Sequence, residues 1–203
     1  MKTILAAFLL SIALVSTVSA QSDGKKTAIF AGGCFWCVES DFDHVKGVVK
    51  TVSGYIGGTN DNPTYKNHGA GRHREAVEIT YDPNQVTYKQ LLHVFWRSVD
   101  PTDGGGQFCD RGFSYTTAVY AVDDEQKQIA ENSKAELVKS GVLKADVVTP
   151  IEKAARFWPA EGYHQDYYNK NPNRYKLYRF GCGRDRRVRA VWGNQAHSGI
   201  DPH

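Results

Sequence analysis

The stretch GGCFWCVES, residues 32–40, marks the point where an expected strand gives way to an expected helix. Residues 26–32 (KTAIFAG) are expected to form a strand, and the helix is expected from residue 35 to about residue 45. Two cysteines, Cys34 and Cys37, therefore flank an aromatic pair at a strand-to-helix turn. Such a segment can be a redox pair, half of a metal site, a structural disulfide, or a nucleophile with its binding pocket attached.

Strands and helices alternate on both sides of this turn. Further strands are expected at residues 48–56, 75–81, 115–122 and 145–151, and further helices at 87–99 and 123–140. Long polar or glycine-rich loops separate them, and the arginine-rich tail from Pro172 shows little periodicity. The pattern predicts one α+β domain with long loops and an irregular C-terminal tail.

The N-terminus has the features of a secretory signal. Residues 1–20, MKTILAAFLLSIALVSTVSA, carry one lysine, an apolar run and small residues at the end. The apolar run is too short and too interrupted by serine and threonine to make a good membrane anchor. We therefore expect residues 21–203 to be exported, periplasmic or secreted, with no stable membrane association after the signal is removed.

Charge and length limit the function classes. The formal net charge of the 203-residue chain is +3, which is too small to indicate a nucleic-acid partner. The basic run at residues 184–189 is typical of a solvated face. The length fits one globular domain with a single core.

Four cysteines, Cys34, Cys37, Cys109 and Cys182, allow three interpretations. An even number in an exported chain is compatible with two structural disulfides. Zinc is disfavoured because a second CxxC pair is missing. A redox role explains more, since Cys34 would begin a helix whose dipole and free N–H groups favour a thiolate. Cys37 then lies within reach of a disulfide.

The aromatic pair Phe35-Trp36 points beyond simple electron transfer. Two rings beside a nucleophilic sulfur make an apolar slot that suits a small nonpolar group such as a methyl. Two ordinary core aromatics would give the same pattern.

Over roughly residues 27–193, the chain resembles the A-type peptide methionine sulfoxide reductases. After the GGCFWCVES signature the matching segments are GYIGG (54–58), NPTY (62–65), GRHREAVEITYDP (71–83), VFWRSVDPTD (94–103), QFCDRGFSYTTAVY (107–120) and EGYHQDYYNKNP (161–172). The resemblance implies a ferredoxin-like α/β roll, related to the βαββαβ sandwich. It also implies reduction of the S epimer of methionine sulfoxide, free or in proteins.

The resemblance also assigns roles to individual residues. Cys34 would be the nucleophile and Glu75 the acid that protonates the sulfoxide oxygen. Five residues would bind or order the substrate: Phe35, Trp36, Tyr65, Asp110 and Tyr115. The chemistry requires such a set, because a sulfoxide oxygen leaves poorly until it is protonated or strongly hydrogen-bonded. A buried carboxyl with a raised pKa can supply that proton near neutral pH.

Recycling has more than one candidate cysteine. A sulfenic acid on Cys34 can condense with another thiol to form a disulfide. Cys37 lies nearest to Cys34 in the sequence, Cys182 is flanked by glycines that let the tail move, and packing alone would also explain Cys109. We expect Cys37 to react first and Cys182 to pass the disulfide outward. No metal or organic cofactor is implied; the expected partner is a thioredoxin-like reductant, and the enzyme is expected to be a monomer.

Alternatives remain open for several residues. Glu75 could be an exposed strand end, Asp110 could cap a turn, His164 is expected to be a packed helix histidine, and Glu161 a helix-start charge. Two rival functions also remain. One is a thioredoxin-like disulfide oxidoreductase that uses Cys34 and Cys37, and the other is a secreted domain stapled by two disulfides.

Overall fold

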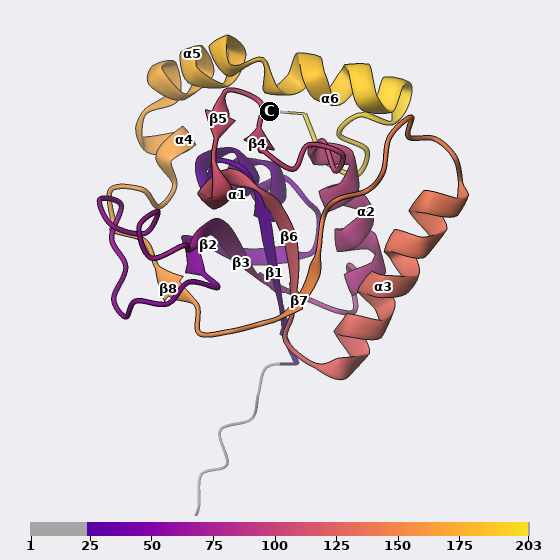
Figure 1. Ribbon diagram of the computed structural model, residues 1–203, viewed down its shortest axis with the longest axis horizontal. Helices are drawn as coiled ribbons and strands as arrows, with labels where there is room; N and C mark the ends of the chain where they lie inside the picture. Colours follow the sequence, from indigo (N-terminus) through magenta and orange to yellow (C-terminus); the bar gives the residue numbers. More distant parts are fainter. Residues whose placement is uncertain (1–23, 203) are drawn as a thin grey trace, which may run out of the picture.

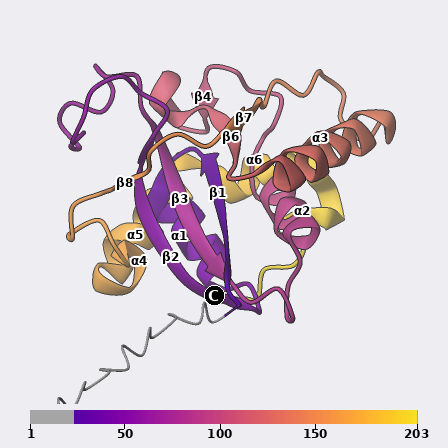
Figure 2. The ribbon, with the colours of Figure 1, turned by 90° about the horizontal axis from the view of Figure 1, so that it is seen from below.

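A six-stranded sheet runs through the middle of the molecule, in the order β7-β6-β1-β3-β2-β8 (Figures 1 and 2). The computed structural model describes residues 24–202, so the expected signal segment 1–20 lies outside the described residues. The strands of this sheet are β1 (Lys26–Gly32), β2 (Val48–Ile56), β3 (Arg74–Tyr81), β6 (Thr117–Ala121), β7 (Ile151–Lys153) and β8 (Trp158–Pro159). A separate two-stranded hairpin consists of β4 (Gly106–Gln107) and β5 (Asp110–Arg111).

Helices pack around this sheet. They are α1 (Phe35–Asp43), α2 (Tyr88–Ser98), α3 (Asp124–Lys139), α4 (Tyr167–Lys170), α5 (Pro172–Cys182) and α6 (Arg184–Trp192), with short 3₁₀ turns η1 (Phe113–Tyr115) and η2 (Gly193–Gln195). Within residues 24–202, every helix is too short or too polar to cross a bilayer.

The order of the first elements defines the fold. The elements β1-α1-β2-β3-α2-β6 follow a βαββαβ pattern, and their strands pair as β6-β1-β3-β2 with every contact antiparallel. Strand β7 adds to β6 in parallel, and β8 adds to β2 antiparallel. This confirms the predicted α+β ferredoxin-like roll.

The central strand β1 is buried on both faces, so apolar residues occupy both sides of its pleat. Phe30 belongs to the main core, where its ring stacks on Phe42 of α1 and Phe95 of α2, with ring centroids 5.3 and 5.0 Å away. Ile29 belongs to a smaller cluster on the other face, beside Tyr120. This two-sided burial explains why the strand reads as a continuous apolar run.

The predicted starts of α2 and α3 agree with the structure because each has a side-chain cap. Thr87 and Gln90 form a capping box at α2. The Asp123 carboxylate accepts the backbone N–H of Gln126 at 2.7 Å, at the start of α3.

The predicted irregular tail is wrong. Residues 172–192 form the helices α5 and α6, which run one after the other across one side of the molecule (Figure 1). Pro172 occupies the first turn of α5, and Gly183 joins the two helices with φ +71°. The inward face includes the buried arginines Arg179 and Arg184, which a hydropathy pattern counts as exposed. Because these arginines take inward positions that apolar residues usually occupy, the sequence of the tail shows little apolar periodicity.

The strand predicted at residues 145–151 is also misplaced, because β7 only begins at Ile151. The Val148 N–H donates to the carbonyl of Pro101 at 2.9 Å instead of to a strand. Pro150 has no N–H to donate. The Pro150 carbonyl accepts the N–H of Val119 at 3.0 Å, and the paired residues of β7 and β6 begin at Ile151.

Candidate active site

Cys34 occupies the turn between β1 and α1, and this turn depends on glycine. Gly33 has φ +89°, and a Cβ there would lie 2.7 Å from Cβ of Gln107. Glycine therefore lets the turn close against β4. Cys34 is the N-cap of α1, and its carbonyl accepts the N–H groups of Cys37 and Val38. Only 7% of Cys34 is exposed, so its sulfur meets a pocket and not open solvent.

Glu75 lies on β3, opposite Tyr55 of β2. Glu75 is 1% exposed, which excludes an exposed strand end. Its Oε2 accepts the backbone N–H of Phe35 at 3.0 Å, so the carboxyl is attached to the first turn of α1. Burial raises the pKa of Glu75 to about 8, although the hydrogen bond from Phe35 opposes the shift. At neutral pH this carboxyl holds a proton that it can donate.

A pocket of about 50 Å³ surrounds the Cys34 sulfur. A water molecule takes about 30 Å³ in the liquid, so the pocket has room for one small group such as a methyl or an oxygen. Its lining consists of Cys34, Phe35, Trp36, Tyr65, Glu75, Asp110, Tyr115 and Tyr178. Seven of these eight side chains are candidate residues from the sequence. The remaining two candidates, Cys37 and Cys182, do not line the pocket.

Two tyrosine hydroxyls complete the polar side of the pocket. Burial, together with the negative charge of ionised Glu75, raises the pKa of both Tyr65 and Tyr115. Both side chains therefore keep their protons, and their hydroxyls hydrogen-bond to one another. They can donate to an oxygen atom without carrying charge.

The loop that carries Tyr65 is held by Glu161. Glu161 Oε1 accepts the backbone N–H of Tyr65, and its Oε2 accepts the hydroxyl of Tyr55, both at 2.9 Å. Glu161 precedes a turn rather than a helix, since α4 only begins at Tyr167. The expectation of a helix-start charge is therefore wrong, and the residue positions a pocket tyrosine instead.

Tyr115 ends the η1 turn, which is held on β3 by two arginines. The guanidinium groups of Arg72 and Arg74 each lie over the Phe113 ring, 4.4 Å from its centroid. Arg74 is itself fixed by a 3.0 Å ion pair with Glu152. Cation–π contacts of this kind fix the turn that presents Tyr115 to the pocket.

The plane of Trp36 is set from two sides. Its indole stacks on Tyr167 at a ring distance of 3.7 Å, and its Nε1–H donates to His164 Nδ1 at 3.0 Å. His164 is buried as expected, but it lies in the turn before α4 and not in a helix. Phe35 is fully buried against Tyr55, so the two rings form a rigid apolar wall.

The thiols of Cys34 and Cys37 are free, buried and hydrogen-bonded to each other. Burial raises the pKa of Cys34, and the neighbouring Cys37 and Glu75 raise it further. The pKa of Cys37 is lowered by the hydrogen bond from Cys34 and by the charges of Arg184 and Arg179. The expected effect of the helix start on Cys34 is thus outweighed in the resting pair. Cys34 holds the proton, and Cys37 is placed to accept it.

Asp110 joins the pocket to the outer cysteines, and it does not cap the following turn η1, which has no side-chain cap. Its Oδ2 accepts the hydroxyl of Tyr178 and lies 3.7 Å from the sulfur of Cys182. Cys182 is bonded to Cys109 in a disulfide, so Cys109 is not a packed hydrophobe. Tyr178 also hydrogen-bonds to Cys34. Sequence reasoning missed Tyr178, because the tail around it gave no helical signal.

A metal would find few ligands in the described part of the chain. Among residues 24–202, one group of three potential ligands lies close together: Cys109, Asp110 and Cys182. The two sulfurs of this group are bonded to each other, so neither is a thiolate ligand.

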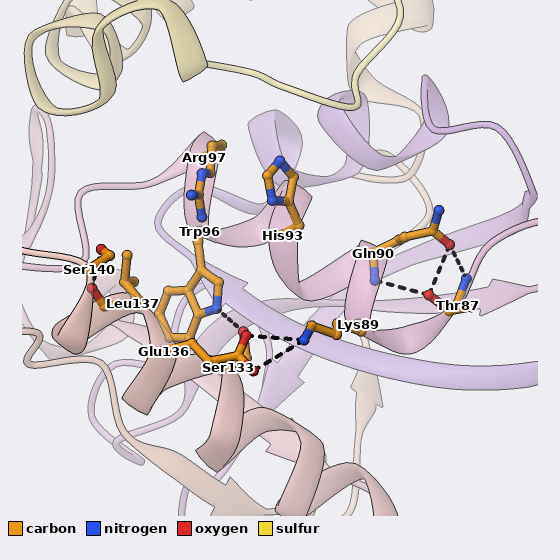
Figure 3. A pocket seen from close by; sticks show the side chains of 10 residues that line it. All are labelled: Thr87, Lys89, Gln90, His93, Trp96, Arg97, Ser133, Glu136, Leu137 and Ser140. Carbon is orange, nitrogen blue, oxygen red and sulfur yellow. Dashed lines mark hydrogen bonds and ion pairs between the residues drawn. The ribbon is translucent and has the colours of Figure 1, made fainter. Parts of the chain in front are cut away.

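A larger cavity of about 420 Å³ lies between α2 and α3 (Figure 3). No cysteine lines it, and several of its polar groups pair with one another. Lys89 pairs with Glu136 at 3.1 Å, and the Trp96 Nε1–H donates to Ser133 at 2.9 Å. The small pocket at Cys34, and not this larger cavity, combines a nucleophile with an acid.

Comparison with known proteins agrees with this geometry. Residues 26–196 match the family model described as peptide methionine sulfoxide reductase. The chain is 54% identical over 182 residues to "Peptide methionine sulfoxide reductase MsrA 2" of Rhizobium meliloti, covering 89% of this chain and 90% of that protein.

Solved structures show the same fold. Methionine sulfoxide reductase A of Corynebacterium diphtheriae is similar with a TM-score of 0.65 and 34% identity, covering 74% of this chain and 77% of that one. Mxr1 of Saccharomyces cerevisiae in reduced form is similar with a TM-score of 0.68 and 29% identity, covering 77% and 91%.

Proposed function

The chain belongs to the A-type peptide methionine sulfoxide reductase family, and we propose that Cys34 is its nucleophile and Glu75 its acid. One observation carries the proposal: a sulfur, a carboxyl with a raised pKa and two tyrosine hydroxyls converge in a pocket of about 50 Å³. As a member of this family the chain is an oxidoreductase that reduces methionine sulfoxide.

The reductive step begins with attack by the Cys34 sulfur on the sulfoxide sulfur. The lowered pKa of Cys37 favours its thiolate, which already accepts a hydrogen bond from Cys34 and is therefore placed to take the thiol proton. Glu75 protonates the sulfoxide oxygen while Tyr65 and Tyr115 donate hydrogen bonds to it. Methionine leaves, and the oxygen remains on Cys34 as a sulfenic acid.

Cys37 then condenses with this sulfenic acid, and water leaves as the Cys34–Cys37 disulfide forms. Support comes from the position of the two thiols, which are one helical turn apart and already hydrogen-bonded. A thioredoxin-like dithiol protein returns two electrons and two protons by thiol–disulfide exchange.

Substrate recognition follows from the rigid wall of Phe35 and Trp36. The wall leaves space for a methyl beside the Cys34 sulfur, and the tyrosine hydroxyls fix the side on which the oxygen lies. We assign the S epimer of methionine sulfoxide, free or in proteins, as the substrate.

The cellular setting is part of the same proposal. Residues 1–20 have the features of a secretory signal, so we place the enzyme in the periplasm or outside the cell. There it acts as a monomer with a thioredoxin-like reductant of that compartment. Neither nucleic acid nor a stable membrane association has a part in this function.

An assay with the two methionine sulfoxide epimers and dithiothreitol tests the proposal. Methionine should form from the S epimer and not from the R epimer. Turnover of neither epimer, with reduction of protein disulfides instead, would favour the thioredoxin-like alternative. That alternative also predicts full activity after Glu75→Gln.

A further inference from the structure

We propose that His68 returns to Glu75 the proton that this carboxyl gives to the substrate. His68 lies in the loop between β2 and β3, and its Nε2 lies 3.9 Å from Oε1 of Glu75. The other carboxyl oxygen, Oε2, accepts the backbone N–H of Phe35. The inference rests on the proposed function. It makes His68 a positioning residue, which acts through Glu75 and does not itself line the pocket.

Glu75 needs a new proton in every turnover. After the reductive step it is a carboxylate that is 1% exposed, and its proton leaves in the water released when Cys34 and Cys37 form their disulfide. The tyrosines of the pocket cannot supply a replacement, because their raised pKa values keep them protonated. Asp110 accepts the hydroxyl of Tyr178, so it is a proton acceptor there. The proton has to come from a group outside the pocket.

The hydrogen bonds of His68 leave Nε2 as its basic nitrogen. Nδ1 lies 3.0 Å from the carbonyl oxygen of Tyr65 and 3.3 Å from that of Thr64. A carbonyl oxygen only accepts, so Nδ1 carries the hydrogen and the neutral ring keeps its lone pair on Nε2, facing Glu75. The ring also stacks on Tyr55, with centroids 4.8 Å apart. Tyr55 pairs with Glu75 across the sheet, so the stacking holds the ring beside the carboxyl.

The order of the two pKa values favours transfer from His68 to Glu75. Burial lowers the pKa of His68, and the neighbouring His73 lowers it further, while hydrogen bonds to the two carbonyls and the charge of Glu161 oppose this shift. His164 adds no charge at neutral pH, because burial lowers its pKa as well. The pKa of Glu75 is raised to about 8. A proton is therefore held less tightly on the imidazole than on the carboxyl.

The transfer moves one proton and no electrons. Nε2 first takes a proton from solvent, which can reach the loop because Asn67 and Gly69, on either side of His68, are exposed. The imidazolium and the Glu75 carboxylate then attract one another, which shortens the 3.9 Å between Nε2 and Oε1. Catalytic hydrogen bonds are often long in the free enzyme and tighten during the reaction. The proton passes to Oε1, and the neutral ring with its hydrogen on Nδ1 is restored.

Infrared difference spectra can follow the protonated carboxyl of Glu75 through one turnover. Its C=O stretch is assigned by its absence in Glu75→Gln. Reduced protein at neutral pH is mixed with one equivalent of methionine S-sulfoxide. The band should disappear as methionine forms and should then return at the rate at which Glu75 regains its proton.

Two substitutions of His68 separate proton transfer from packing. His68→Asn keeps an N–H near the position of Nδ1, which can still bind the Tyr65 carbonyl, but it has no basic nitrogen. His68→Gln places its amide near the position of Nε2 and cannot titrate either. In both variants the ratio of the return rate to the loss rate should fall by about 10²–10⁴-fold, the usual contribution of a positioned proton donor. His93→Asn on α2, outside the pocket, is the control and should keep the wild-type ratio.

The remaining outcomes contradict separate parts of the argument. A wild-type ratio in both His68 variants overturns proton return by His68 and leaves the proposed function intact. A lowered ratio in His68→Gln alone also overturns it, because His68 would then only anchor the loop that carries Tyr65. A band that stays while methionine forms would instead overturn the proposed role of Glu75 as the acid.

Discussion

The turn at Cys34 and the tail helix α5 both line the active site, but the sequence pattern predicts the structure of the turn and not that of the tail helices α5 and α6. The turn follows a strand of apolar residues and is marked by Gly33, so pattern and conformation agree. The tail buries Arg179 and Arg184 among polar partners, so its pattern looks like that of a solvated segment. Apolar periodicity identifies the parts of a core made of hydrocarbon and overlooks a core made of ion pairs.

Asp41 of α1 is what makes this polar core possible. Its carboxylate lies 2.7 Å from Arg179 and 3.4 Å from Arg184. Arg184 also donates to the carbonyls of Gly32 and Ser98, each at 3.0 Å. The arginines thereby attach the tail to α1 and to the end of β1, at the base of the Cys34 turn.

The largest expected effect lies in the turn. Cys34→Ser should abolish methionine formation, because the pocket contains no other sulfur that can attack the substrate. Methionine release in a single turnover is the measurement, with circular dichroism to show that the variant is folded. Any methionine formed stoichiometrically by this variant would assign the chemistry to another cysteine.

Glu75→Gln should slow that single turnover by about 10²–10⁴-fold, the usual contribution of a general acid. The pH profile provides the sharper readout. Since the pKa of Glu75 is raised to about 8 and its protonated form reacts, the wild-type rate should fall as pH rises through that value. Glutamine does not titrate, so this fall should vanish in the variant. If the single-turnover rates of both proteins fell at high pH with the same midpoint, Glu75 would have no part in the mechanism.

The tail provides the next effect, on stability. Arg184→Met leaves the buried Asp41 without one of its two cations, and breaking a buried pair costs about 3–5 kcal/mol. Arg189→Met on the same helix is the control, because Arg189 is exposed and should change stability by less than about 0.5 kcal/mol. Urea unfolding measures both variants. Equal free energies of unfolding for the two variants would mean that the buried Arg184 contributes no more to stability than an exposed arginine. The contrast between turn and tail would then disappear.

Much of the fold and site could thus be predicted, for reasons that particular residues make clear. The sequence predicts Lys26–Gly32 and Val48–Ile56 to the residue, because the first is mostly apolar, the second is rich in β-branched residues, and glycines stand at or beside their ends. Tyr178 was missed because its helix is held by arginines, and the Cys109–Cys182 pairing was missed because 73 positions separate two isolated cysteines. Only the folded chain brings such pairs together.

The aromatic wall should have a smaller effect than the acid. Trp36→Ala should relax the preference for methyl over ethyl sulfoxides by about 10–200-fold, because one good apolar contact contributes about 1–3 kcal/mol. The control is Phe180→Ala on α5, an aromatic that is 87% exposed and does not line the pocket. Relative rates on the two sulfoxides are the measurement. A Trp36 variant that keeps the wild-type ratio would mean that the wall does not select the alkyl group.

The smallest expected effect is that of Tyr178, a residue of the tail helix α5, on the reactivity of Cys34 in the turn. The hydroxyl of Tyr178 hydrogen-bonds to Cys34 and to Asp110 and lowers the pKa of both groups. Tyr178→Phe should therefore raise both pKa values and reduce the thiolate of Cys34 at neutral pH. A net loss of about 1.4 kcal/mol corresponds to roughly tenfold slower reduction, within the range for a hydrogen bond to a charged group.

The pH dependence of Cys34 alkylation by iodoacetamide tests this directly. Its midpoint should move to higher pH in Tyr178→Phe, so that the variant regains reactivity as pH rises. The matched control is Tyr175→Phe, which loses a 2.9 Å hydrogen bond from Arg179 on the same helix but lines no part of the pocket. If the tail has only a structural role, the midpoint of Cys34 alkylation should stay unchanged in both variants or move by the same amount in both. A shift confined to Tyr178 would mean that a segment without sequence signal tunes the nucleophile of the segment with the strongest one.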